Sequence, residues 1–313
     1  MLASIPFSIG QNNHSLAIST SGAVSGWGAN GSDGALGLPR GNGSVIVNTP
    51  IALPSLGSAV QVQACGYLFS VALHADGTVW LLPSGSDINR TAVTARQIDS
   101  LADIASLGRS GEPAFGEACS MLAVDKAGVL RMLDLVATSG SNGDVTTSTV
   151  SVIGNLPAVI QAQCSDDFSS RHCLALTAGG QIWAWGQNVY GQLGDGTNIG
   201  RTIPVKVIGI DTAVQVAVLN GGSLARLADG TVWSWGGSLA TGRSTNMPED
   251  GYLAAPISGL NGVSTLAVGY DHACALKADG TVWCWGQNDF GQLGLGTFTA
   301  APVPEQAVGI NLN

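Results

Sequence analysis

Charged residues are scarce in this chain. They make up 11% of the 313 residues, against about a quarter in ordinary globular domains. Twelve are Lys or Arg, of which three are Lys, and 21 are Asp or Glu, so the formal net charge is −9. Such a composition leaves no basic surface on which to hold phosphates, and we expect no nucleic-acid partner.

Long apolar runs are missing as well. No stretch approaches the roughly 18 residues that span a bilayer, and the N-terminal MLASIPFSIG has neither the basic start nor the long apolar core of a signal peptide. We therefore expect a soluble protein, no membrane partner and no export signal in the given chain. Disorder is excluded because 45% of the residues are hydrophobic and low-complexity runs are absent.

Catalytic motifs are also missing. The sequence has no Gly-x-Ser-x-Gly elbow, no His-Glu-x-x-His and no Walker-type loop. Residues 26–31 match the dinucleotide pattern GxGxxG, but no helix follows to receive a pyrophosphate. We predict a protein that is not an enzyme and that binds no cofactor.

The six cysteines include no CxxC pair, which argues against a zinc site. Cys274 and Cys284 stand five residues on either side of Asp279, so a hairpin turning there places them opposite each other. We predict a disulfide between them, with two small buried apolar residues as the alternative. Cys164 and Cys173 bracket one loop and form a second candidate pair. A disulfide favours an oxidising compartment, extracellular or periplasmic.

Glycine is abundant, with 44 residues, and six glycines recur at a near-constant interval. Each lies between two strand-like runs, and a tight hairpin turn needs positive φ at its centre. The six hairpin glycines are Gly22, Gly77, Gly128, Gly180, Gly230 and Gly280, separated by 55, 51, 52, 50 and 50 residues. This period indicates stacked or radial repeats, because one such unit cannot bury its own apolar face.

Each repeat divides into four short strands, which in the fifth copy are residues 204–208, 213–218, 223–227 and 231–235. This pattern predicts an all-β fold: one β-propeller domain over residues 1–313, with six four-stranded antiparallel blades and seven as the alternative. Residues 302–310 repeat the first-strand pattern with no second strand after it, and residues 5–9 resemble a second strand with no first strand before it. We therefore expect the N- and C-terminal strands to share one blade and close the ring.

The sixth repeat, HACALKADGTVWCWGQNDFGQLGLGT at residues 272–297, shows the repeated motifs most fully. Its Asp-Gly-Thr-Val-Trp turn, Trp-Gly pair and Gly-Gln-Leu-Gly loop resemble the regulator of chromosome condensation repeat family. Members of that family fold as β-propellers, usually with seven blades. The resemblance covers nearly the whole chain, although repeats two, three and five lose the loop motif. In character the chain is most similar to secreted bacterial members such as β-lactamase inhibitory protein II, which are acidic and bind through aromatic residues on one face.

Two repeated side chains have both a functional and a structural interpretation. His14, His172 and His272 occupy one repeat position and suggest a metal site, but propeller symmetry would keep equivalent residues apart, so we favour a hydrogen-bonding role. Trp-x-Trp pairs on three repeats suggest a stacking platform for a ligand. Packing between blades is the simpler account.

Aromatic residues gather where the repeats differ. Nine of the ten Phe and Tyr residues fall in or beside the connections between the second and third strands, or in those between one repeat and the next. In an antiparallel blade these connections emerge on one face. Tyr190 and Phe290 precede Gly-Gln-Leu-Gly, where local packing explains an aromatic residue, so we leave them out of the site. The predicted partner-binding residues are Tyr67, Phe69, Arg109, Glu112, Phe115, Asp166, Asp167, Phe168, Tyr252, Tyr270 and Asp271.

Aromatic anchors among acidic residues are typical of a protein interface. The sequence thus predicts an exported, bacterial, non-enzymatic scaffold that binds another protein, as an inhibitor does. One alternative is nucleotide exchange on a small GTPase, which the resemblance implies because the nuclear founder of the family has that activity. The other alternative is an enzyme with a site in the central channel.

Overall fold

The structure is a computed structural model. It describes residues 7–9, 14–29, 36, 46–65, 69–82, 94–109, 118–137, 145–165, 171–237, 239–243 and 252–311, and the statements below concern this part of the chain. It divides into two compact units, the N-terminal unit Met1–Gly154 and the C-terminal unit Asn155–Asn313, each of which is described by itself.

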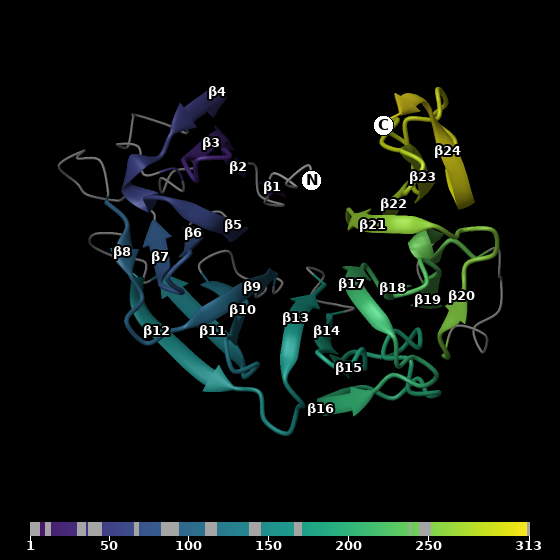
Figure 1. Cartoon of the computed structure of the whole chain (residues 1–313), viewed down its shortest axis with the longest axis horizontal. Helices are drawn as coiled ribbons and strands as arrows, with labels where there is room; N and C mark the ends of the chain where they lie inside the picture. Colours follow the sequence, from purple (N-terminus) through teal and green to yellow (C-terminus); the bar gives the residue numbers. More distant parts are fainter. Residues whose placement is uncertain are drawn as a thin grey trace. The chain divides into compact units, whose positions relative to one another are not determined.

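The fold is all-β, and its six sheets are the four-stranded antiparallel blades of a β-propeller, three in each unit (Figure 1). This confirms six blades over the alternative of seven. The N-terminal unit contains β1 (Phe7–Ile9), β2 (His14–Ile18), β3 (Val24–Ala29) and β4 (Ile46–Ala52); β5 (Ala59–Cys65), β6 (Phe69–His74), β7 (Val79–Leu82) and β8 (Arg96–Gln97); and β9 (Ile104–Arg109), β10 (Ala118–Asp125), β11 (Leu130–Ala137) and β12 (Val145–Val152).

The C-terminal unit is built in the same way. It contains β13 (Val159–Cys164), β14 (His172–Thr177), β15 (Ile182–Gly186) and β16 (Arg201–Lys206); β17 (Ala213–Leu219), β18 (Gly222–Leu227), β19 (Val232–Gly236) and β20 (Ala255–Pro256); and β21 (Val263–Val268), β22 (His272–Lys277), β23 (Thr281–Gly286) and β24 (Ala301–Asn311). The helical elements of the described residues are two 3₁₀ turns, η1 (Pro54–Leu56) and η2 (Leu239–Thr241). Neither has the length or the apolar content that crossing a membrane requires.

The predicted closure of the ring is wrong. β24 pairs with β23, and β1 pairs with β2, so the N- and C-terminal strands belong to different blades. Each blade is continuous in sequence, because the run that we assigned to the start of a repeat folds back as the last strand of the blade before it. β16 is one example, since it pairs with β15. Because the pattern of four strands recurs along the chain, the sequence does not mark which strand begins a blade. In the structure the loop before the fourth strand reverses the chain, so the fourth strand pairs antiparallel with the third strand of the same blade.

The six hairpin glycines adopt the predicted conformation, with φ between 78° and 91°. In the fifth and sixth hairpins the turn is fixed from inside, because the carboxylates of Asp229 and Asp279 accept hydrogen bonds from the backbone N–H and the hydroxyl of the Thr two residues later. At Gly180 a Cβ would lie 2.6 Å from the carbonyl oxygen of Asp211. That glycine therefore serves both the turn and the close approach of the next blade.

Apolar side chains pack between successive blades of each unit. One cluster joins Leu174 and Leu176 of β14 to Val216 of β17. The inner strands are also tied by glutamine side chains that mimic a backbone pair. The Gln215 amide donates to the carbonyl of Leu266 at 2.9 Å and accepts from its N–H at 3.0 Å. Gln61 and Gln161 bind Leu107 and Val216 in the same way.

Candidate functional site

The site is built at the end of the C-terminal unit where its loops emerge. In each observed blade the loop between the first and second strands and the loop between the third and fourth strands lie side by side there. These are the two connections that we predicted on one face, where the shifted repeat boundary made them the second-to-third connection and the connection to the next repeat. Three backbone hydrogen bonds show this: Gln187 N–H to Arg171, Gly237 N–H to Gly221, and Gln287 N–H to Asp271, each to the carbonyl oxygen at 2.8–2.9 Å. The strands therefore present the variable loops of three successive blades at one end.

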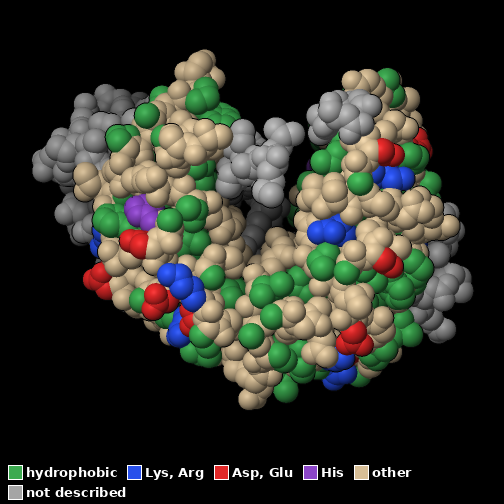
Figure 2. Space-filling view, in the orientation of Figure 1, with side chains coloured by type: hydrophobic (Ala, Val, Ile, Leu, Met, Phe, Trp, Pro, Cys, Tyr) green, Lys and Arg blue, Asp and Glu red, His purple; other side chains and the backbone are tan. Residues whose placement is uncertain are grey.

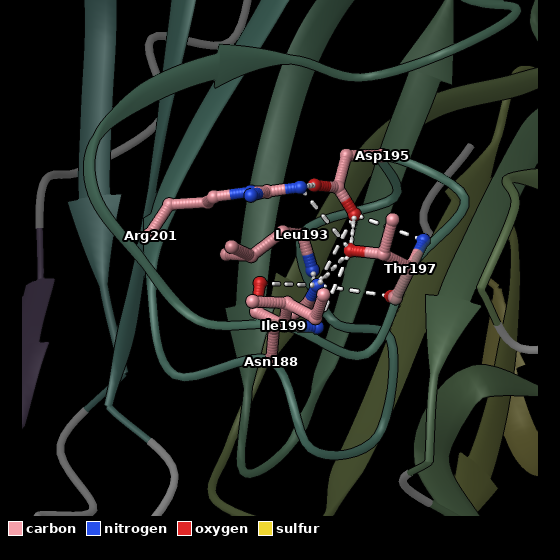
Figure 3. A network of polar contacts seen from close by, with 6 residues as sticks. All are labelled: Asn188, Leu193, Asp195, Thr197, Ile199 and Arg201. Carbon is pink, nitrogen blue, oxygen red and sulfur yellow. Dashed lines mark hydrogen bonds and ion pairs between the residues drawn. The ribbon is translucent and has the colours of Figure 1, made fainter.

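A buried asparagine organises the loop that leaves β15. The Asn188 side chain donates to the carbonyl oxygens of Thr197 (2.9 Å) and Ile199 (3.1 Å), and its oxygen accepts from the N–H of Leu193 at 2.9 Å (Figure 3). Asn288 makes the equivalent bonds in the loop that leaves β23. One amide thus holds three points of each loop, so both loops are rigid supports.

The Asn188 loop carries an additional ion pair, between Arg201 and Asp195 at 2.7 Å (Figure 3). Burial alone would raise the pKa of Asp195, but hydrogen bonds from Thr197 and Arg201 outweigh burial and bring this pKa below its usual value. The carboxylate is therefore already occupied within the loop, and its role is structural.

These rigid loops present aromatic rings. Asn188 to Gly191 and Asn288 to Gly291 form β-turns closed by an N–H to carbonyl hydrogen bond, which places Tyr190 and Phe290 at the third turn position. Tyr190 lies against the next blade, because a Cβ at Gly221 would be 3.2 Å from its ring, yet it remains 55% exposed. Phe290 is 90% exposed, a large apolar area to leave in water.

Tyr270 extends this surface across the unit. It is 45% exposed, and its carbonyl oxygen accepts from the N–H of Asn220 at 3.1 Å, next to the Gly221 that Tyr190 covers. Asp271, which follows it, binds the loop that carries Phe290 through Gln287. We call Tyr190, Tyr270, Phe290, Asp271 and Asp289 the aromatic strip. Its members lie on loops of two blades, Tyr190 in the blade of β13 to β16 and the others in the blade of β21 to β24.

The predicted site residues have different outcomes. Tyr270 and Asp271 lie in the aromatic strip. Tyr252 is half-buried, and its carbonyl oxygen accepts from the N–H of Gly196 at 3.1 Å. Phe69 is completely buried in β6, within the core shared with β9 and β10, so the structure removes it from the predicted surface. Its position at the start of a strand directs the ring inward.

The other predicted residues cannot be placed on this surface. Arg109 ends β9, and its side chain lies outside the described part. Outside it altogether are Tyr67, Glu112, Phe115, Asp166, Asp167 and Phe168.

The sequence analysis missed Tyr190 and Phe290 because they precede a repeated motif that we assigned to local packing. The available signal was their place inside a four-residue turn, where side chains project outward.

The cysteine prediction is confirmed. Cys274 and Cys284 form a disulfide between β22 and β23, where they are directly opposite, and Cys164 pairs with Cys173 between β13 and β14.

The repeated histidine has a structural role in the fourth repeat, where it is His172. His172 is completely buried, and its Nε2 lies 2.8 Å from the Ser223 hydroxyl, which donates to the carbonyl of Gln192 at 2.9 Å. Because that hydroxyl uses its proton on Gln192, His172 is the donor in the pair and does not activate Ser223 as a nucleophile. Among the described residues no cluster of three His, Cys, Asp or Glu side chains could hold a metal ion.

The inner tryptophans are core residues, as favoured above. Trp235 and Trp285 are completely buried, and their indole N–H groups donate to the carbonyls of Gln192 and Ala240.

Comparison with known proteins agrees with the repeats and the propeller fold described above. The regulator of chromosome condensation (RCC1) repeat matches residues 263–292, and a second description of that repeat matches residues 179–225 and 279–312. The chain is 33% identical over 210 residues to the ultraviolet-B receptor UVR8 of Arabidopsis thaliana, covering 63% of this chain and 44% of the receptor. It is 31% identical over 213 residues to the mitochondrial RCC1 domain-containing protein RUG3 of the same plant, covering 67% of this chain and 36% of RUG3. The chain thus spans less than half the length of these curated relatives.

The fold is similar to that of Prp20p from Saccharomyces cerevisiae, with a TM-score of 0.74 and 22% identity over 96% of this chain and 76% of Prp20p. Repeat matches in the C-terminal unit and the likeness of the whole fold lead to one conclusion. This chain is an RCC1-like β-propeller, with RCC1 repeats matched in its C-terminal unit.

Proposed function

We propose that this protein is a non-enzymatic scaffold that binds another protein through the aromatic strip. The observation that carries the proposal is Phe290, which is 90% exposed on a loop where the Asn288 side chain donates two hydrogen bonds and accepts a third. A side chain on a rigid loop loses little conformational entropy on binding. Most of the free energy gained by burying its ring in a partner therefore contributes to affinity.

Relatives of the same fold support a binding role. The structure of Prp20p was described together with its binding to Gsp1p and histones, and Prp20 was also crystallised bound to Kap60. Charge on this chain also supports a protein partner over nucleic acid. On the face drawn in Figure 2, Lys and Arg side chains are scattered among Asp and Glu and form no continuous basic area. We further propose an oxidising compartment, extracellular or periplasmic, because both described cysteine pairs are bridged.

Site-specific photocrosslinking tests this function. The photoreactive amino acid p-benzoylphenylalanine replaces Phe290, and a control replaces Val308 of β24, which is 69% exposed outside the aromatic strip. In the organism that makes the chain, we expect a discrete protein adduct from position 290 and none from position 308. Adducts of equal yield at both positions, or none at either, would contradict the proposal.

A second candidate function is guanine-nucleotide exchange on a small GTPase, which the likeness to the Gsp1p-binding Prp20p favours. Release of a fluorescent nucleotide from a candidate GTPase of the same organism separates the two functions. Accelerated release that Phe290→Ala abolishes would assign exchange activity to the aromatic strip, whereas binding without release supports the scaffold.

A further inference from the structure

We propose that Cys65 and Cys119 form a third disulfide, which joins two neighbouring blades of the N-terminal unit. Cys65 ends β5, the first strand of one blade, and Cys119 is the second residue of β10, in the next blade. The inference goes beyond the proposed function, because it does not involve the aromatic strip.

The register of the two blades places both cysteines at one level. The Gln61 amide donates to the carbonyl oxygen of Leu107 at 2.6 Å and accepts from its N–H at 2.8 Å, and Leu107 pairs with Ala123 of β10. β5 lies beside both β9 and β10. Cys65 stands four residues after Gln61, and Cys119 four residues before Ala123. Both steps lead toward the connection between the first and second strands of the blade.

The equivalent boundary in the C-terminal unit shows what lies at this level. There Gln215 makes the same pair of hydrogen bonds to Leu266. Five residues after Gln215 along the chain, the backbone N–H of Asn220 donates to the carbonyl oxygen of Tyr270 at 3.1 Å. The backbones of neighbouring blades therefore touch at the end of the first strand.

The two cysteines occupy positions that flank this contact. The same count from the glutamine places Cys65 at the position of Leu219, and the strand pairing places Cys119 at the position of Asp271. Only the backbone of Cys119 is described, so its place is taken from the strand register. Residues next to a shared backbone hydrogen bond have Cα atoms within about the reach of a disulfide, whose Cα atoms stand about 4.4–6.8 Å apart.

The state of the other cysteines leaves one partner within the chain. Four of the six cysteines are bridged in pairs, each inside its own blade. Among the described residues, which include Cys65, no cysteine is free. Cys119 is the one that remains.

Formation of the bridge removes two protons and two electrons from the two thiols. Another disulfide, such as oxidised glutathione, accepts them and is reduced to two thiols. The bridge links residues 54 apart in the sequence, whereas the other two disulfides link residues 9 and 10 apart. Among the described strands none is shared between two blades, so this bridge adds a covalent tie that strand pairing does not provide.

Peptide mapping tests the pairing. Protein refolded with oxidised and reduced glutathione is denatured in N-ethylmaleimide, which blocks thiol exchange, and is digested with trypsin without reduction. Cleavage after Lys and Arg puts Cys65 in residues 41–90 and Cys119 in residues 110–126, and it places every other cysteine in a separate peptide. We expect these two peptides as one linked species that separates on reduction. Either peptide modified by N-ethylmaleimide, or linked to a third peptide, would overturn the inference.

Melting temperatures test whether the bridge holds the blades together. Cys65→Ala, Cys119→Ala and the double variant should each melt about 5–10 °C below the unmodified protein, because either single change removes the whole bridge. The control Cys164→Ala/Cys173→Ala opens a bridge between strands that are already paired, and it should lose less. Losses of the two single variants that add up in the double variant would show two independent thiols and contradict the bridge.

Discussion

At the scale of single residues, the repeats act as internal controls for one another. The indole N–H groups of Trp80 and Trp283 each donate to the hydroxyl of the Thr two residues earlier, at 3.1 Å. In the fourth repeat that position is Gln181, and the indole N–H of Trp183 is buried without a hydrogen-bond partner. A buried donor without a hydrogen-bond partner lowers the free energy of unfolding. The fourth repeat is therefore less stable at this position than the second and sixth repeats.

Restoring the turn should therefore stabilise the protein. Gly179→Asp/Gln181→Thr recreates the Asp-Gly-Thr turn of the fifth and sixth repeats, and a Cβ at Gly179 would meet only the Thr177 hydroxyl, at 3.9 Å. We expect the free energy of unfolding to rise by about 1 kcal/mol, measured by urea denaturation. Gln181→Ala is the control, because it removes the glutamine without supplying an acceptor. A double variant no more stable than this control would show that the unpaired indole costs nothing.

At the scale of elements, the loops that leave β15 and β23 are each held by the side chain of one buried asparagine. Asn288 is completely buried, and its side chain replaces the backbone partners that three loop groups would otherwise lack. These loops, with no regular secondary structure, thus hold Tyr190 and Phe290 in fixed positions at the blade ends. Rigidity here depends on one side chain per loop.

Removing that side chain should loosen the loop while the blade persists. Asn288→Ala leaves two carbonyls and one N–H without their partner, so we expect a loss of about 2–3 kcal/mol and rapid proteolysis between residues 288 and 300. Mass spectrometry of timed digests locates the cuts. The control Asp289→Ala changes an exposed side chain of the same loop and should leave the digest unchanged. Equal cleavage rates in both variants would exclude the asparagine as the support of the loop.

At the scale of the whole molecule, acid should destabilise the protein in two steps. Burial lowers the pKa of His14 to about 4, from its ordinary value of 6.5. The unfolded chain therefore binds more protons between these values, and the free energy of unfolding falls as pH drops from 6.5 to 4, by up to about 3 kcal/mol. The turn carboxylates of Asp229 and Asp279 have pKa values below normal, because the Thr hydroxyl and backbone N–H donate to them. Their contribution is present above pH 3.8 and is lost below it.

Denaturant titrations at pH 7.5, 5.5 and 4 measure the first step. His14→Gln should reduce the slope between pH 6.5 and 4, where His272, whose pKa is also lowered by burial, still contributes, and should leave the loss at lower pH intact. Identical pH dependence in both proteins would mean that His14 is not the group responsible. Since a lost buried hydrogen bond could lower the stability of the variant at every pH, the slope is the quantity compared.

Much of this architecture could be predicted from local sequence. Tight-turn dipeptides at a period of about fifty residues predict six hairpins and six blades, because positive φ and strand propensity act within a few residues. The Cys274–Cys284 disulfide was predictable for the same reason, since both cysteines stand at equal distances from one turn. The site was predictable only in its location on the loop face and in Tyr270 and Asp271.

The sequence by itself determined the repeat, the all-β fold and the pairing inside each hairpin, because these depend on short-range backbone preferences. Two further features depended on the tertiary structure. Only the packed structure decided that each blade is continuous in sequence, so that β24 completes its own blade, and that Phe69 is buried while Phe290 is exposed. Strand pairing across a long loop and the burial of one ring are set by neighbours distant in sequence, and a repeat motif is the same whether or not a neighbour covers it.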